Sequence, residues 1–429
     1  MTAAIERQPH TASYYAATLN DDTRYPPLAG DSVADICVIG GGFSGVATAL
    51  TLAERGYEVV LLEQHRIGWG ASGRNGGQVI GGISGADKLV RDLGQEVADM
   101  VWDIGYRGHE IIEERIAKYA IDCDYKHGYI DVAIKPRHMR DFEAHYQELQ
   151  QRGFGDQVRL VPPEEMESVV GTSAYIGGLI NNRNGHLHPL NLCVGEARAA
   201  ASLGTRIHEG SPVTAIQHGN KPVVKTSAGQ VTANQVVLTG NAYNTLERSR
   251  LPGQIFPAGS FIIATEPLSE QEAQRLNPFD LAVCDPNFVL DYFRLSPDRR
   301  MLFGGRCNYS GRDPKSIKAD ILPRMLKLYP SLAGKRIDYE WGGKIGIVIN
   351  RVPLFGRIEP NVFYAMGYSG HGVNATHAAG EIMADAVAGT LEQLDIFERI
   401  GHHKIPFGQT FGNQMLALGM LYYRLRDLL

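Results

Sequence analysis

The sequence predicts an α/β protein in which a nucleotide-binding domain with a parallel sheet is interleaved with a smaller α+β domain built on an antiparallel sheet. Three observations support this fold class: a strand–helix–strand pattern near the N-terminus, strand and hairpin patterns through the middle of the chain, and a strand–turn–helix pattern over residues 361–389. The chain has 429 residues, more than one hydrophobic core usually organises, so two domains are expected.

The first βαβ unit runs from Ala34 to Gln64. Short apolar runs at Ile36–Ile39 and Val59–Leu62 are typical of buried parallel strands. Between them, apolar residues recur at helical spacing up to Gly56, which predicts one helix. The order strand, helix, strand is that of a Rossmann-type unit.

Three glycines follow the first strand in the pattern G-x-G-x-x-G. Gly40 allows a tight turn, Gly42 lets a pyrophosphate approach the backbone, and Gly45 lets the helix pack closely on the strand. The N-terminus of the helix offers N–H groups and a positive dipole end to a phosphate. Glu63 ends the second strand, 18 residues after Gly45, where an acid accepts hydrogen bonds from ribose hydroxyls. An acid there disfavours a 2′-phosphate, so the unit predicts NAD or FAD rather than NADP.

A glycine-rich segment, GWGASGRNGGQ (Gly68–Gln78), begins five residues after Glu63. Five of its eleven residues are glycine and it shows no apolar period, so it is expected to be a loop whose backbone is closely approached by another group. A nicotinamide enzyme does not need such a loop, whereas the bulky isoalloxazine ring of a flavin must lie against backbone. The loop therefore favours FAD.

The strand–turn–helix pattern near the C-terminus carries a second glycine-rich turn, Ser369–Val373. Gly370 and Gly372 allow backbone N–H groups to point at a ligand, and the following helix places its positive end there. Reduced flavin is negatively charged, so this arrangement would stabilise it. His371 is a candidate donor or positive charge at the same place, and a solvent-exposed or packing histidine is the alternative.

The segments between these units mix helix and strand patterns, which predicts that a nucleotide-binding domain and an antiparallel-sheet domain share the chain discontinuously. A long helical stretch covers Glu96–Ile121, and strand patterns follow at His127–Ile134 and Pro212–Gln217. A hairpin with a buried strand is expected over Pro222–Asn241, and an antiparallel hairpin over Asn287–Gly305. The Rossmann-type FAD-binding domain is expected at residues 1–95, 186–255 and 340–429, and the α+β substrate domain at 96–185 and 256–339.

Bulk composition excludes several classes of protein. A net charge of −5 gives no sign of nucleic-acid binding, and five scattered cysteines without a CxxC pair argue against a disulfide framework or a metal site. No signal peptide and no apolar run long enough to span a bilayer are visible, so a cytoplasmic location is expected. The apolar run Met415–Tyr423 predicts a buried or interface helix, through which the protein could form oligomers, with a membrane-surface helix as the alternative.

The whole chain resembles the D-amino-acid oxidase-like flavoprotein superfamily, which includes glycine and sarcosine oxidases, and within it is similar to bacterial gamma-glutamylputrescine oxidoreductases. The segments that carry the resemblance are SYYAAT (Ser13–Thr18), IGWGASGRNGGQ (Ile67–Gln78), GHLHPLNL (Gly185–Leu192), GNAY (Gly240–Tyr243), ATEPL (Ala264–Leu268) and GYSGHGVNATHAAG (Gly367–Gly380). Their set is specific for the superfamily and suggestive for the substrate.

The resemblance, together with the two glycine-rich loops, implies a set of FAD-binding residues. They are Gly40, Gly42, Phe43, Ser44, Gly45, Glu63, Gln64, Ser72, Arg74, Asn75, Gly76, Gly77, Gln78, Val213, Gly240, Ser369, Gly370, His371, Gly372 and Val373. Some relatives attach FAD covalently through a cysteine in the C-terminal third. No cysteine follows Cys307 here, so non-covalent FAD is expected.

One departure from the superfamily bears on the substrate. Amino-acid oxidases often carry W-x-G-x-R-P-x-T-x-D-G-x-P, whose arginine clamps the substrate carboxylate. The matching stretch here is Trp341–Pro353, with Ile345 at the arginine position. An α-carboxylate would lack its bidentate partner, which favours a primary amine without one. Lys344 is adjacent and is an alternative partner as a point charge, so His371, Trp341 and Lys344 are the candidate catalytic residues.

The resemblance implies oxidation of gamma-glutamylputrescine, or a similar gamma-glutamylated polyamine, to the aldehyde with release of ammonia and hydrogen peroxide, as in putrescine degradation. Oxygen would be the acceptor, although a dehydrogenase is an alternative. Two other readings stay open: an amino-acid oxidase or dehydrogenase of the same fold, and a flavin-binding subunit without turnover. Tyr292, Phe293, Trp341 and Tyr368 are candidates for an apolar slot, and Arg294 and Arg306 for a distal carboxylate, with structural roles as the alternative.

Overall fold

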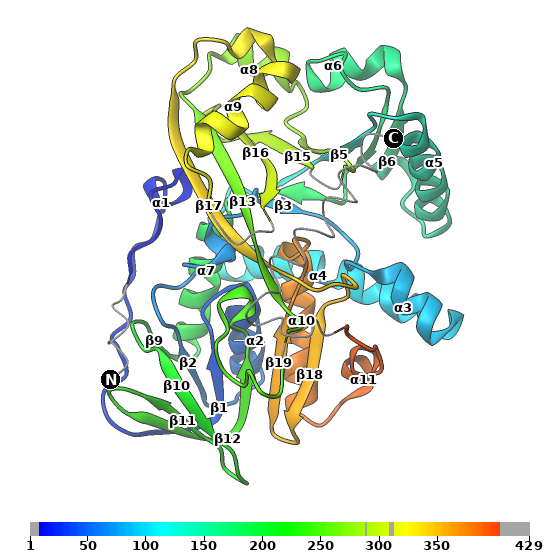
Figure 1. The fold of residues 1–429 in the computed structure, drawn as a ribbon. Helices are drawn as coiled ribbons and strands as arrows, with labels where there is room; N and C mark the ends of the chain where they lie inside the picture. Colours follow the sequence, from blue (N-terminus) through cyan, green and yellow to red (C-terminus); the bar gives the residue numbers. More distant parts are fainter. Residues whose placement is uncertain (1–7, 252, 288–289, 309–312, 404–429) are drawn as a thin grey trace.

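The fold is described by a computed structural model that covers residues 8–251, 253–287, 290–308 and 313–403 (Figure 1). Two large sheets dominate it, and the long strands β13 and β17 run from the upper sheet toward the lower one. The lower sheet contains the predicted Rossmann unit, and the upper sheet is largely antiparallel. The predicted α/β fold class is confirmed.

The lower sheet, here called the Rossmann sheet, has strand order β10-β11-β12-β1-β2-β9, with β19 beside β12 and β18 beside β19. Its core is parallel, because β1 pairs in parallel with both β2 and β12. The strands are β1 (Ser32–Ile39), β2 (Val59–Leu62), β9 (Arg206–His208), β10 (Val213–Gln217), β11 (Val223–Thr226), β12 (Gln230–Leu238), β18 (Leu354–Glu359) and β19 (Val362–Met366).

The upper sheet, here called the antiparallel sheet, has order β17-β13-β16-β15-β14-β5-β7-β6. One pair in it, β14 with β5, is parallel. The strands are β5 (Tyr129–Val132), β6 (Val158–Val161), β7 (Gly178–Asn181), β13 (Phe256–Thr265), β14 (Ala282–Cys284), β15 (Asp291–Leu295), β16 (Met301–Asn308) and β17 (Ile337–Ile347). A small third sheet joins β3 (Gln78–Val79), β8 (Gly185–His186) and β4 (Lys126–His127).

The helices of the described residues cover both sheets. They are α1 (Tyr14–Ala17), α2 (Phe43–Glu54), α3 (Ala86–Leu93), α4 (Ala98–Tyr119), α5 (Pro136–Gln151), α6 (Met166–Val170), α7 (Pro189–Ser202), α8 (Glu270–Leu276), α9 (Ile317–Leu328), α10 (Val373–Val387) and α11 (Glu392–Glu398). Helix α2 packs against α7 and α10, and α10 also packs against α4. Helix α9 packs against β13, β16 and β17.

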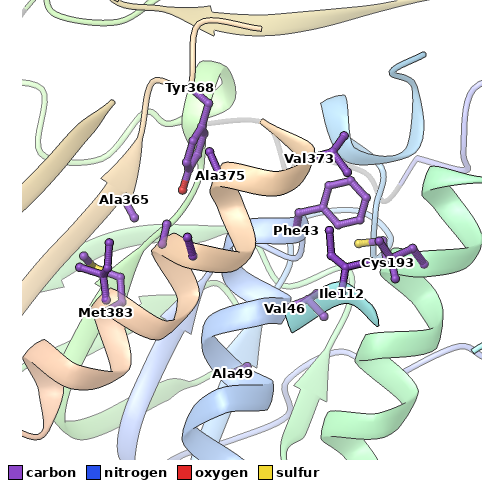
Figure 2. Packing of buried hydrophobic residues seen from close by; sticks show 14 of the residues in the cluster. Phe43, Val46, Ala49, Ile112, Cys193, Ala365, Tyr368, Val373, Ala375 and Met383 are labelled. Carbon is purple, nitrogen blue, oxygen red and sulfur yellow. The ribbon is translucent and has the colours of Figure 1, made fainter. Parts of the chain in front are cut away.

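The close packing of α2 on α10 depends on small residues. A Cβ added at Gly380 of α10 would lie 2.8 Å from the carbonyl carbon of Ala47 on α2, so only glycine fits at this crossing. The N-terminal ends of the two helices meet in one buried apolar cluster, and Figure 2 shows Phe43 of α2 close to Val373 of α10. Both N-termini therefore reach the same region of the molecule.

A fully buried ion group ties α4, α7 and α10 together. The Glu196 carboxylate accepts a hydrogen bond from Arg115 Nη1 at 3.0 Å and lies 3.1 Å from His377 Nε2. Burial alone would raise the pKa of Glu196, but the charges of His377 and Arg115 outweigh it and leave that pKa below its ordinary value. The pairing compensates the burial of these charges behind the Rossmann sheet.

Several expected elements are confirmed. The second strand of the first unit runs from Val59 to Leu62 as predicted, and its helix ends at Glu54, two residues before Gly56. The hairpin expected within residues 287–305 is β15 paired antiparallel with β16, and the long helical stretch is α4. The proposed domain boundaries stay a prediction. The C-terminal interface helix, Met415–Tyr423, lies outside the described residues. Within the described chain, no helix is both long and apolar enough to cross a membrane.

Candidate functional site

Two cavities meet between the sheets. The first, here called the Rossmann cavity, has a volume of about 410 Å³ and lies over the glycines that follow β1. The second, the sheet cavity, has a volume of about 460 Å³ and opens onto β5, β14, β15 and β17 of the antiparallel sheet. Their shared lining residues are Ala71, Asn75, Ile345, Ser369, Gly370, Gly372 and Val373. The two glycine-rich loops thus form the junction between the cavities.

The floor of the Rossmann cavity is the turn between β1 and α2. Gly40 has φ of +113°, a conformation open to glycine, and a Cβ at Gly45 would lie 1.8 Å from the Gly40 carbonyl oxygen. Gly42 is the N-cap of α2 and has no side chain to cover the helix end. The first N–H groups of a helix have no partner within it, so this end is an anion-binding position.

Glu63 closes the carboxyl end of β2 beside this turn. Its Oε2 accepts the N–H of Gly41 at 2.6 Å, and its Oε1 accepts the N–H of His65 at 2.7 Å. Burial raises the pKa of Glu63 to about 7, although these backbone donors oppose the rise. The carboxylate is held in one orientation at the cavity wall. Its hydrogen bond to a ribose stays a prediction.

The first glycine-rich loop is fixed by its own polar side chains. Asn75 Nδ2 donates to the carbonyl oxygens of Ala71 and Ser72, and its Oδ1 accepts the N–H of Gly77. Ser72 Oγ accepts the N–H of Phe43 at 2.8 Å, which ties the loop to the first turn of α2. The loop is therefore a rigid wall at the junction of the cavities.

Arg74 supports the same loop. Its guanidinium carbon lies 4.4 Å from the centre of the Trp69 ring, and Nε donates to the Trp69 carbonyl oxygen. Nη1 donates to the carbonyl oxygen of Gly342 on β17. Trp341 Nε1 in turn donates to the Arg74 carbonyl oxygen at 3.0 Å. These contacts hold the loop against the edge of the antiparallel sheet.

The second glycine-rich turn faces the first loop. Ser369 and Gly370 both have positive φ, at 54° and 92°, and Gly372 is the N-cap of α10. His371 Nε2 lies 3.1 Å from the carbonyl oxygen of Gly81, so this nitrogen carries the hydrogen and donates it. Burial lowers the pKa of His371, and the nearby backbone acceptors oppose the fall. A neutral imidazole therefore lines the sheet cavity at neutral pH.

The wall of the sheet cavity comes from paired strands of the antiparallel sheet. Asp131, Cys284 and Tyr292 are register partners on β5, β14 and β15, so their side chains share one face. Tyr292 Oη lies 3.0 Å from Ser260 Oγ on β13. Ile345 of β17 lines both cavities. The wall is thus mainly apolar, with one carboxylate at a distance from the junction.

Most of the predicted cofactor residues line one cavity or both. They are Gly40, Gly42, Phe43, Ser44, Glu63, Gln64, Ser72, Arg74, Asn75, Gly76, Gln78, Val213, Gly240, Ser369, Gly370, His371, Gly372 and Val373. Gly45 and Gly77 line neither. Gly45 packs on Gly40, and a Cβ at Gly77 would lie 2.2 Å from the Leu187 carbonyl oxygen, so both act through backbone packing.

Two of the three candidate catalytic side chains do not line a cavity. Gly343 and Ile345 face the sheet cavity, and because side chains alternate along a strand, Lys344 between them faces the other way. Trp341 is 2% exposed and packs edge-on against the Tyr15 ring. The geometry gives Trp341 a supporting place behind the loop, and a direct catalytic role for either residue stays a prediction. His371 is the candidate that reaches the cavity.

The FAD dependent oxidoreductase (DAO) family profile matches residues 35–386, which is most of the chain. The chain belongs to this family. The gamma-glutamylputrescine oxidoreductase of Escherichia coli (strain K12) is 42% identical over 420 residues, covering 97% of this chain and 98% of its own. A probable oxidoreductase, OrdL, of Haemophilus influenzae is 41% identical and covers 98% of each chain. The crystal structure of glycine oxidase from Geobacillus kaustophilus superposes with a TM-score of 0.71 at 20% identity, covering 86% of this chain and 100% of that one.

The residues of this member of the FAD dependent oxidoreductase family fit the cofactor. The N-cap glycine Gly42 and the close packing at Gly45 leave room for a pyrophosphate at the N-terminus of α2, and Glu63 at the end of β2 would accept a hydrogen bond from the ribose. The cavity then continues past Asn75 to the turn at Gly370, where a ring system would meet backbone on two sides. Whether the bond to FAD is covalent is left to experiment.

Sequence reasoning missed several lining residues. Trp69, His65 and Asn244 line the Rossmann cavity, and Asp131 and Arg351 line the sheet cavity. For Asp131 a signal existed: it is a charged residue inside an otherwise apolar strand pattern, YIDV. The strand pairing that brings it to the cavity could not be read from local pattern.

Proposed function

We propose that this protein oxidises a primary amine with FAD, and that its substrate is gamma-glutamylputrescine or a similar gamma-glutamylated polyamine. Molecular oxygen would be the acceptor. The observation that carries the proposal is Ile345, an apolar residue at the junction of the two cavities, at the position where amino-acid oxidases of this kind carry a carboxylate-binding arginine. The 42% identity to an enzyme named for gamma-glutamylputrescine supports it.

The proposed reaction transfers two electrons from the amine to oxygen. The carbon next to the amine loses a hydrogen with two electrons and the nitrogen loses a proton, which leaves a carbon–nitrogen double bond. Water adds to that carbon and the carbon–nitrogen bond breaks, giving the aldehyde and ammonia. Oxygen gains the two electrons and two protons and becomes hydrogen peroxide. When bound, FAD supplies the two-electron acceptor for the first step.

The chain itself positions the amine and keeps the His371 imidazole uncharged. The Tyr292 ring and the backbone at Gly76 enclose the space beside the junction, since a Cβ at Gly76 would lie 2.7 Å from Tyr292 Cε2. Burial keeps His371 neutral, so it does not repel a cationic amine as it enters. Positioning of this kind supplies a large part of the rate when no acid–base pair is needed.

A panel of amines tests the proposal. The purified flavoprotein is mixed without oxygen with gamma-glutamylputrescine, glycine, sarcosine or a D-amino acid, and flavin absorbance is followed. Bleaching by gamma-glutamylputrescine at the lowest concentration supports the proposal, and bleaching only by amino acids contradicts it. No bleaching by any of them would favour a flavin-binding subunit without turnover. Hydrogen peroxide formed in air distinguishes an oxidase from a dehydrogenase.

One observation favours a second candidate, oxidation of an amino acid. Arg351, in the loop after β17, lines the sheet cavity and has a positive φ of 66°. Its Nη1 donates to the Ser369 carbonyl oxygen at 3.5 Å, which places a guanidinium next to the second glycine-rich turn. A guanidinium there is able to bind a carboxylate. The same amine panel separates this candidate from the first.

A further inference from the structure

The sheet cavity has a charged position that the reaction at the junction does not use. Among the described residues that line this cavity, Asp131 is the only carboxylate. It lies on β5, two strands away from Tyr292 along one row of register partners, Asp131–Cys284–Tyr292. Neighbouring strands are about 4.8 Å apart, so the two Cα atoms are separated by about 10 Å.

Tyr292 marks the reacting end of this row. Its ring lies within contact distance of the glycine-rich loop at Gly76, and its hydroxyl is held by Ser260. Asp131 therefore stands at the other end of this row from the glycine-rich loop at Gly76. A substrate that places its amine at the junction extends along the row toward this carboxylate.

Among the described residues, the Asp131 carboxylate has one neutral hydrogen-bond donor and no ion-pair partner. Tyr129 Oη donates to Oδ1 at 2.7 Å, and no salt bridge within the described chain includes Asp131. Burial raises the pKa of Asp131 to about 6, against the opposing effects of the Tyr129 hydrogen bond and the more distant charge of His145. Burial also keeps the neighbouring Cys284 thiol neutral, since its pKa is raised well above the ordinary value.

The surroundings of the Asp131 carboxylate favour the binding of a cationic group of a ligand. At neutral pH the carboxylate is ionised, and burying an ionised group without a partner is unfavourable. An ammonium group in the cavity would provide the missing charge through a charge-assisted hydrogen bond. A carboxylate in the same place would be repelled.

We propose that Asp131 determines specificity by binding a second ammonium group of the substrate, at the opposite end from the amine that is oxidised. This inference rests on the proposed function. In gamma-glutamylputrescine the two ammonium nitrogens are separated by ten bonds, about 12 Å when extended, which is comparable with the distance of about 10 Å between the Cα atoms of Asp131 and Tyr292. A monoamine has no group for this position.

The test compares two ligands that differ in that one group. Gamma-glutamylputrescine carries the second ammonium, and the glutaryl amide of putrescine has the same length and carboxylate without it. Anaerobic reduction of the flavin gives the apparent Kd and the limiting rate for each, in the wild type, in Asp131→Asn and in Asp141→Asn, a control that makes the same change at an exposed position outside the cavity lining.

Asp131→Asn is expected to raise the apparent Kd for gamma-glutamylputrescine about 10- to 100-fold, and to change that for the glutaryl amide less than about twofold. The limiting rate of reduction should change little for either ligand, because Asp131 is remote from the reacting carbon. Asp141→Asn should leave the preference of the wild type for the ammonium-bearing ligand intact.

Three outcomes would count against the inference. Equal weakening of both ligands by Asp131→Asn overturns it and leaves the proposed function standing. If Asp131→Asn does not fold, the wild type alone decides, since equal affinity for the two ligands overturns the inference too. If neither amine reduces the wild-type flavin, the proposed function fails and the inference falls with it.

Discussion

Replacing Gly76 by valine tests whether the first glycine-rich loop is shaped by the flavin. A Cβ at Gly76 would lie 2.3 Å from Gln78 Oε1 and 2.7 Å from Tyr292 Cε2, whereas carbon atoms in contact normally stay about 3.5–4.0 Å apart. The neighbours cannot yield freely, because Ser260 lies 3.0 Å from the Tyr292 hydroxyl and Arg294 Nε donates to the Gly76 carbonyl oxygen at 2.8 Å. The loop must therefore move by about 1 Å away from the Tyr292 ring.

The cost of that movement should appear in cofactor binding. Overpacking of this size costs about 1–3 kcal/mol. In the apoprotein the displaced loop can occupy part of the cavity. It must return to its original position when FAD binds, so the cost of overpacking reduces the affinity for FAD. The Kd for FAD is then expected to rise about 5- to 150-fold in Gly76→Val, with little change in the melting temperature of the apoprotein.

The assay is quenching of flavin fluorescence as FAD is added to apoprotein, with thermal unfolding of the same apoprotein. Gly401→Val is the control, because a Cβ at Gly401 meets nothing within 4 Å. Unchanged FAD affinity in Gly76→Val, with or without a lower melting temperature, would show that the loop does not face the cofactor and is only a packed surface loop.

Three further outcomes are expected. The pKa of Asp131 is raised to about 6, and binding of a second ammonium needs its ionised form. KM for gamma-glutamylputrescine should therefore rise several-fold from pH 7 to pH 5 in the wild type, and this rise should be absent in Asp131→Asn. The same dependence of KM on pH in the wild type and in Asp131→Asn would contradict the prediction. Glu196→Gln should lower the free energy of unfolding in urea by about 3–5 kcal/mol, because it removes the charge between buried Arg115 and His377, and a loss below about 1 kcal/mol would refute that pairing. Acid precipitation should leave the flavin in the supernatant, because no cysteine follows Cys307; a yellow pellet would show covalent attachment.

Local signals in the sequence were enough for the Rossmann unit. The boundaries of β2 follow from a short-range pattern, an apolar run of strand length that ends in an acid, whereas β1 begins at Ser32, four residues before its predicted start. The requirement for glycine at Gly40 and Gly45 comes from close contacts within the turn itself. It can therefore be predicted from the sequence without knowledge of the rest of the fold. The predicted cofactor residues Gly40 and Gly42 line the Rossmann cavity because they belong to this turn.

Contacts between residues that are far apart in the chain could not be predicted from the sequence. Arg294 was a candidate for a substrate carboxylate, yet it is buried and donates to the carbonyl oxygens of Gly76 and Leu187, which are far from it in the chain. No local pattern reveals that a backbone carbonyl from another segment will meet a guanidinium. The same limit applies to Asp131, whose place at the cavity depends on the parallel pairing of β5 with β14.

The register of β17 decides which residue faces the proposed substrate site. From the sequence, Ile345 and Lys344 are both candidates to face the substrate, and one residue of register exchanges them. In the structure Ile345 lines both cavities, and a Cβ at Gly370 would lie 3.2 Å from its Cδ1, so it touches the second glycine-rich turn. The Lys344 N–H lies 3.2 Å from the Tyr243 hydroxyl, and its side chain faces away from the sheet cavity.

Ile345→Arg therefore should change substrate preference, and Lys344→Arg should not. A guanidinium at the junction would bind an α-carboxylate through two parallel hydrogen bonds and repel an incoming ammonium. The ratio of kcat/KM for glycine or a D-amino acid to that for gamma-glutamylputrescine is expected to rise at least about 10-fold in Ile345→Arg, and to stay near the wild-type value in Lys344→Arg. Equal shifts in the two variants would mean that the strand does not present Ile345 to the substrate, and the case for an amine without an α-carboxylate would lose its structural basis.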